Sequence, residues 1–182
     1  RVVAQGLTPE LGQQVIVENR GGAGGAIAIE MTARATPDGY TLLLYGSAIW
    51  LLPALRNSVG WDPVRDFTPI TMAASSPHIM LVHPSVPAKN VQELIALAKS
   101  KPGGLNYASG GPGSTAHIVT EILKSVAGID MVHVPYKGGG PGLNDLVAGK
   151  VQLMLPPISA NVVSQVKAGR LRALAVTSAQ PS

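Results

Sequence analysis

The chain has 182 residues, of which 46% are hydrophobic and 13% charged, so it can bury the core of one α/β domain or two small lobes, which excludes an intrinsically disordered chain. The net charge of +4 comes from basic residues spread along the sequence, and aromatic residues make up only 4%, which argues against a nucleic-acid-binding surface. The lack of cysteine excludes disulfides, thiolate metal sites and cysteine nucleophiles.

The first part of the chain is predicted to alternate helices with short strands. Hydrophobic spacing predicts helices over 1–12 and 26–35 and strands over 15–18, 41–45, 68–73 and 78–82. Asn90 and Glu93 form a capping-box pattern that opens a further helix, which the Pro- and Gly-containing stretch at 101–104 ends. This stretch is the best internal boundary of the chain.

The glycines at 21–25 follow a predicted strand and precede a helix, as they do in a dinucleotide-binding turn. Ile27 stands where the third glycine of that motif belongs, and no acidic residue ends the strand at 41–45. We therefore interpret these glycines as permitting a close approach of the helix to the sheet.

The second part of the chain repeats the same alternation. Strands are predicted over 105–107, 131–135, 151–155 and 171–176, each separated from the next by a helix. Strands that alternate with helices predict a parallel, doubly wound sheet. With a boundary near residue 102, the fold class is α/β with two lobes, formed by residues 1–101 and 102–182.

The stretch from Leu105 to His117 passes from a strand through a glycine-rich turn into a helix. Glycines let the backbone approach a ligand, and the first amides of a helix attract anions. The candidate ligand residues in this stretch are Ser109, Gly111, Gly113, Ser114 and Thr115. A capped helix after an ordinary βα loop explains the same residues, and the stretch alone leaves both interpretations open.

Two further loops stand at the ends of predicted strands. Their candidate ligand residues are Ser47, Ala48, Lys137, Gly138 and Gly139. Lys137 either meets an anion or is simply solvated. Because ligands of α/β sheets bind at the carboxyl ends of the strands, two facing lobes are expected to bring these loops to the 109–115 loop.

The sequence carries no clear catalytic constellation. Ser109 has Tyr107 where a Gly-x-Ser-x-Gly elbow needs glycine, although a pairing of Ser109 or Ser114 with His117 is conceivable. The four histidines show no metal-ligand spacing, and the ten acidic residues form no close pair. We therefore expect no enzyme, metal or cofactor, but a binding module built from backbone amides and hydroxyls.

Several segments together resemble the substrate-binding receptors of tripartite tricarboxylate transporters, also called the Bug family. The resemblance extends over essentially the whole chain. Its motifs are VENRGGAGG at 17–25, PDGYTLL at 37–43, WDPVRDF at 61–67, HPSVPAK at 83–89, LNYAS at 105–109, VHVPYKG at 132–138 and AGRLRALAVT at 168–177.

This resemblance implies a two-lobed, Venus-flytrap fold of the periplasmic-binding-protein type, with parallel sheets flanked by helices. It implies a periplasmic receptor that passes a small organic carboxylate to a membrane permease. The carboxylate would be held mainly by backbone amides, hydroxyls and waters, with the 46–47 and 109–115 loops lining the cleft and Lys137 to Gly139 facing them. The family's first strand and closing tail would lie outside residues 1–182, so the implied fold is incomplete at both ends.

Two points limit what the resemblance implies. Members of the family often carry a polar residue where Pro156 and Pro157 stand, which argues against an amino-acid ligand here. The effector-binding domain of a transcription regulator shares the two-lobed fold and is the alternative function. A signal peptide ahead of Arg1 would favour the receptor, and a helix-turn-helix would favour the regulator.

Overall fold

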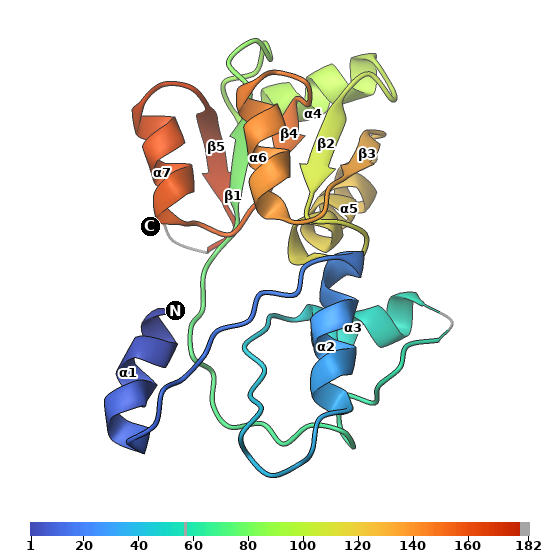
Figure 1. Ribbon diagram of the computed structural model, residues 1–182. Coiled ribbons are helices and arrows are strands. Elements are labelled where there is room, and N and C mark those ends of the chain that lie inside the picture. The colour runs from blue at the N-terminus through green and yellow to red at the C-terminus, as the bar shows by residue number, and fades with distance from the viewer. Residues whose placement is uncertain (57, 179–182) are drawn as a thin grey trace.

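A computed structural model describes residues 1–56 and 58–178, in which five strands form a mixed sheet of order β3-β2-β4-β1-β5 (Figure 1). The strands are β1 (Ile79–Val82), β2 (Asn106–Ser109), β3 (Val132–Pro135), β4 (Leu153–Met154) and β5 (Arg172–Val176). Each of the five strands lies within or next to a segment that the sequence predicted as a strand. The predictions of strands over 78–82, 105–107, 131–135, 151–155 and 171–176 are therefore confirmed.

The direction of β1 corrects the prediction of a parallel sheet. β2 runs parallel to β3 and to β4, whereas β1 is antiparallel to both of its neighbours, β4 and β5. The reason is the path of the chain. Residues ahead of β1 rise from the lower part of the molecule to the edge where the parallel strands end, so β1 enters the sheet at their carboxyl ends and runs the opposite way (Figure 1).

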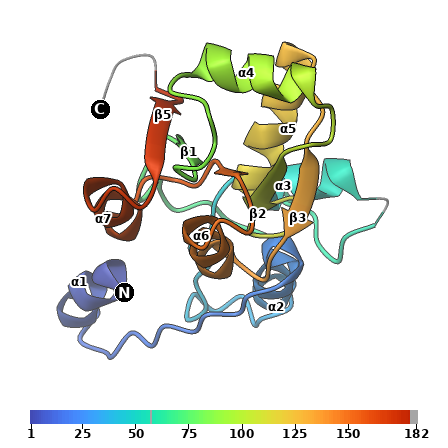
Figure 2. The ribbon, with the colours of Figure 1, turned by 90° about the horizontal axis from the view of Figure 1, so that it is seen from above.

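Helices cover both faces of this sheet. α4 (Val91–Ser100) and α5 (Thr115–Ala127) lie on one face, and α6 (Gly139–Val147) and α7 (Ala160–Lys167) lie on the other (Figure 2). Strand residues alternate between the two cores, so that Tyr107 packs with α4 and α5 while Ala108 packs with α6 and α7. None of the helices in the described residues is long and apolar enough to cross a membrane.

The sheet does not break at the predicted boundary near residue 102. β1 lies between β4 and β5, and Leu94 and Ala98 of α4 belong to the same buried cluster as Tyr107 and Leu153. The 101–104 stretch is therefore a turn within one packed unit. The extended segment ahead of His78 is where the chain leaves this unit for the preceding residues.

Residues 1–56 and 58–77 contain helices around a smaller core. These helices are α1 (Val2–Leu11), the 3-10 turn η1 (Ala23–Gly25), α2 (Ala26–Ala33) and α3 (Ala48–Leu55). The core consists of Ala26, Ile29, Ala48, Leu52 and Trp61. The Trp61 indole N–H donates to the carbonyl oxygen of Ile49 at 3.0 Å, which joins the 61–67 segment to α3.

The strands predicted over 15–18, 41–45 and 68–73 do not form in the part of the chain that the structure describes, so this prediction is wrong. These segments are extended, but none pairs with another strand within the described residues. Their apolar side chains are correspondingly exposed, as Ile16, Leu44 and Met72 illustrate with relative exposures of 78%, 64% and 83%. β-branched composition favours extended backbone, but a strand forms only where a neighbour completes its hydrogen bonds.

The predicted capping box at the start of α4 is confirmed. Asn90 Oδ1 accepts the Glu93 N–H at 2.9 Å, and Glu93 Oε2 accepts the Lys89 N–H at 2.7 Å. Asn90→Ala is expected to lower the free energy of unfolding by about 1 kcal/mol, because the first turn loses its acceptor. Urea unfolding measures this. Asn90→Ser keeps an acceptor without placing a second carboxylate beside Glu93, to which Asn90 Nδ2 donates at 2.7 Å, and should lose less than about 0.5 kcal/mol; equal losses in both variants would contradict the capping role.

Candidate ligand-binding site

The end of β2 turns sharply around the side chain of Ser109. This side chain is fully buried; its hydroxyl accepts the Gly111 N–H at 3.0 Å and lies 2.6 Å from His133 Nε2. The turn needs glycine at two positions, because Gly111 has φ 111° and Gly113 has φ 81°. The Ser109 hydroxyl therefore shapes the loop from within.

The loop continues into the beginning of α5. Ser114 is the N-cap, and its hydroxyl accepts the His117 N–H at 3.4 Å. The Gly113 N–H donates to His117 Nδ1 at 3.2 Å. Sequence reasoning assigned the Ser114 and Thr115 hydroxyls to an anion; in the structure the Ser114 hydroxyl caps the helix.

The glycine-rich segment at 21–25 lies directly against this loop. A Cβ added to Gly24 would stand 2.2 Å from the carbonyl oxygen of Pro112, and one added to Gly111 would stand 3.5 Å from the Gly24 nitrogen. Figure 1 shows the same approach, with the beginning of α2 against the lower end of the sheet. These glycines permit a contact between two loops, which corrects the interpretation that they serve helix-to-sheet packing.

Two side chains donate hydrogen bonds to the backbone of the 21–25 segment. The Tyr45 hydroxyl donates to the carbonyl oxygen of Gly24 at 2.8 Å, and Arg56 Nη2 donates to that of Ala23 at 3.0 Å. Burial raises the pKa of Tyr45, so its hydroxyl keeps its proton and remains a donor. Sequence reasoning missed this segment as part of the site. The signal that could have found it is its position after a predicted strand, shared with the three loops that were selected.

The third loop, after β3, adjoins the first. A Cβ on Gly110 would lie 3.4 Å from the nitrogen of Gly139, and one on Gly21 would lie 3.8 Å from the carbonyl oxygen of Lys137. Gly138 is the N-cap of α6 and has φ 125°. The side chain of Lys137 is exposed and makes no ion pair with any residue in the described part of the chain.

The fourth loop, which begins α3, reaches the same place. Ser47 is the exposed N-cap residue of α3, and Ala48 is buried in the small core, so Ala48 offers the site only its backbone. Leu52 packs on the first loop so tightly that a Cβ on Gly113 would stand 2.1 Å from its Cδ2 atom. The structure thus brings together all three loops selected from the sequence and adds the 21–25 segment.

Ser109 and His133 do not form a catalytic pair. A hydrolytic triad needs an exposed serine and an acid that orients the histidine, but Ser109 is buried and His133 stacks between the rings of Tyr107 and His117. Glu121, the nearby acid, accepts hydrogen bonds from the Tyr107 hydroxyl and Lys124. Among the described residues, no group of three metal-binding side chains occurs either.

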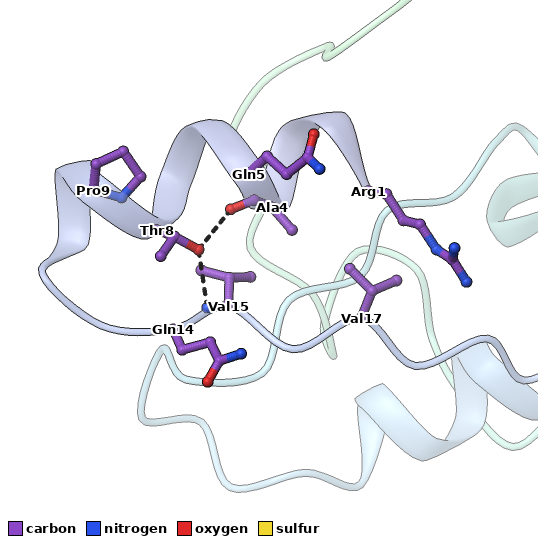
Figure 3. A pocket seen from close by; sticks show the side chains of 8 residues that line it. All are labelled: Arg1, Ala4, Gln5, Thr8, Pro9, Gln14, Val15 and Val17. Carbon is purple, nitrogen blue, oxygen red and sulfur yellow. Dashed lines mark hydrogen bonds between the residues drawn. The ribbon is translucent and has the colours of Figure 1, made fainter.

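A hollow far from these loops lies between α1 and the extended segment after it (Figure 3). Its volume is about 470 Å³, and the Thr8 hydroxyl joins its walls by donating to the Ala4 carbonyl at 2.8 Å and accepting the Val15 N–H at 3.2 Å. The residues that line it are Arg1, Ala4, Gln5, Thr8, Pro9, Gln14, Val15 and Val17. None of these was a candidate ligand residue.

A mixed α/β sheet whose strand-end loops meet loops from the preceding segment defines a protein of the solute-binding type. Its sequence agrees with this class. The chain belongs to the tripartite tricarboxylate transporter receptor family. The family described as "Tripartite tricarboxylate transporter family receptor" matches residues 1–182. The family match favours the receptor over the regulator domain considered as the alternative.

Relatives of known name or structure share this fold. The chain is 37% identical over 184 residues to the protein BugT of Bordetella pertussis, covering 100% of this chain and 56% of BugT. It is 35% identical to Rpa4515 of R. palustris, solved with adipate, with a TM-score of 0.89 over 99% of this chain and 60% of the other. It is 31% identical to MatC of Rhodopseudomonas palustris, solved with bound malate, with a TM-score of 0.89 over 99% and 61%.

The chain spans about half the length of the curated relatives it matches, 53% and 56% in two examples. The ligand, the partners and the activity of the whole protein are therefore matters for proposal.

Proposed function

We propose that this chain is part of a periplasmic solute receptor that binds a small organic carboxylate and delivers it to the permease of a tripartite tricarboxylate transporter, without catalysing a reaction. The observation that carries the proposal is the convergence of four glycine-containing loops, two of which lead into the amino ends of α5 and α6. Backbone amides at helix starts favour anions. The adipate and malate found in the two related structures are small organic carboxylates, as proposed for the ligand of this chain.

The proposed receptor has two lobes that close on the ligand. The sequence predicted their division near residue 102; because β1 and α4 share the sheet and core of the later strands, we place the division ahead of His78. The ligand would then lie between the 21–25 and 46–48 loops of one lobe and the 109–115 and 137–139 loops of the other.

Thermal unfolding of the intact protein with a panel of carboxylates tests this function. Adipate, malate and a tricarboxylate are compared with the neutral diamide of adipate, an amine and a sugar. At about a hundred times the dissociation constant, a ligand stabilises the folded state by about 2.7 kcal/mol, which raises the melting temperature by about 3–5 °C for a protein about twice as long as this chain. We expect that shift for at least one carboxylate and none for the diamide. Stabilisation by amines or sugars, with none by carboxylates, would contradict the proposal.

A further inference from the structure

Three aromatic rings form a stack directly behind the 109–113 loop. Tyr107 of β2 lies on His133 of β3 with ring centroids 4.8 Å apart and planes at 14°, and His133 lies on His117 of α5 with centroids 4.3 Å apart and planes at 28°. Sequence reasoning treated His133 as a core or edge residue and His117 as a capping or packing residue. Their placement together behind the loop gives them a joint role that neither position suggests alone.

Each histidine is joined to the loop by one hydrogen bond. His117 Nδ1 accepts the Gly113 N–H at 3.2 Å, and His133 Nε2 contacts the Ser109 hydroxyl, which itself accepts the Gly111 N–H. A backbone amide can only donate a hydrogen bond, so Nδ1 of His117 carries a lone pair and the proton of the neutral ring is on Nε2. Loss of this acceptor would leave the N–H of the buried Gly113 without its partner.

The charged groups beside the stack pair with each other. Glu121 accepts hydrogen bonds from the Tyr107 hydroxyl and, at 2.9 Å, from Lys124 Nζ. Burial chiefly lowers the pKa of His133, against the opposing effect of Glu121. Solvent reaches the cluster through a hollow of about 300 Å³, lined in part by His117, Glu121 and Leu55.

We propose that His117 is a positioning residue whose ring accepts the Gly113 N–H and so holds the 110–113 loop in the form that binds the carboxylate. The ligand part of this inference rests on the proposed function; the loop part does not.

Amide hydrogen exchange at Gly113 in the ligand-free intact protein tests the loop part. His117→Asn places an amide oxygen near the position of Nδ1, whereas His117→Ala removes the acceptor. Protection of Gly113 in His117→Ala is expected to be about tenfold lower than in the wild type, after correction for intrinsic exchange, which is the size of one net hydrogen bond. It should stay near the wild-type value in His117→Asn.

His83→Ala is the matched control, because His83 Nδ1 contacts only the Ser85 hydroxyl and backbone amide, away from the loop. This variant should keep the wild-type protection of Gly113. Two results would overturn the inference: wild-type protection of Gly113 in His117→Ala, or an equal loss of protection in His83→Ala.

Titration calorimetry with malate tests the ligand part. Relative to the wild type, the dissociation constant is expected to rise about tenfold in His117→Ala and by less than about twofold in His117→Asn. A wild-type dissociation constant in His117→Ala would overturn it. If no carboxylate binds the wild type, the proposed function fails, while the exchange measurement still decides the role of His117.

Discussion

Gly24→Ala is expected to lower the free energy of unfolding by about 3 kcal/mol or more and to weaken carboxylate binding at least tenfold. Gly24 has φ 67° and ψ 21°, a left-handed conformation that costs a residue with a side chain about 1–2 kcal/mol. The new Cβ would also stand 2.2 Å from the carbonyl oxygen of Pro112. Since that neighbour is backbone, no rotamer change relieves the overlap, and the 21–25 and 110–113 loops must separate.

Gly169→Ala is the matched control for this variant. Gly169 has φ 68°, almost the same as Gly24, and a Cβ there would meet no atom within 4 Å. It therefore reports the backbone strain alone, about 1–2 kcal/mol. Urea unfolding and titration calorimetry on both variants separate the two effects. Equal destabilisation, or unchanged carboxylate affinity in Gly24→Ala, would mean that the contact between the loops neither stabilises the protein nor positions its ligand.

The second part of the fold could be predicted because its signals are local. The amide and hydroxyl caps at Asn90 and Ser114 lie where the sequence indicated, and each accepts a hydrogen bond from the backbone of its own helix. Glycine at the end of a helix is equally local, as at Gly12 and Gly128, which adopt φ 62° and 61°.

The direction of β1 and the packing of α4 and β2 into one core could not be predicted in this way. Both depend on which strands become neighbours, and the pattern of residues within a strand does not encode its partner. The turn at 101–104 has all the signals of a boundary, yet α4 and β2 on its two sides pack into one core. The strands predicted at 15–18, 41–45 and 68–73 were wrong for the same reason, because strand propensity does not supply a partner.

The sequence predicted which loops would meet at the candidate site, but only in part what each residue in them does. The 46–48, 109–115 and 137–139 loops meet, as the rule for strand ends led us to expect. The role of Ser109 differs from the expected one, because its hydroxyl points into the protein and holds the loop together. The contribution of His133 could not be predicted from the sequence. It depends on the register of β3 against β2, which sets Tyr107 beside His133 and Ser109 beside Pro135.

Ser109→Ala is accordingly expected to lower the free energy of unfolding by about 2–4 kcal/mol, because it leaves both the buried Gly111 N–H and His133 Nε2 without their partner, each at a cost of about 1–3 kcal/mol. Ser100→Ala removes an exposed hydroxyl that donates only to the Leu97 carbonyl, so its loss should stay within about 0.5 kcal/mol. Urea unfolding compares them, and equal stabilities would refute the buried role of Ser109.

The wild-type protein, tested with a panel of esters and amides, should show no turnover. Hydrolysis by the wild type that disappears in Ser109→Ala would instead make Ser109 a nucleophile, which its burial argues against.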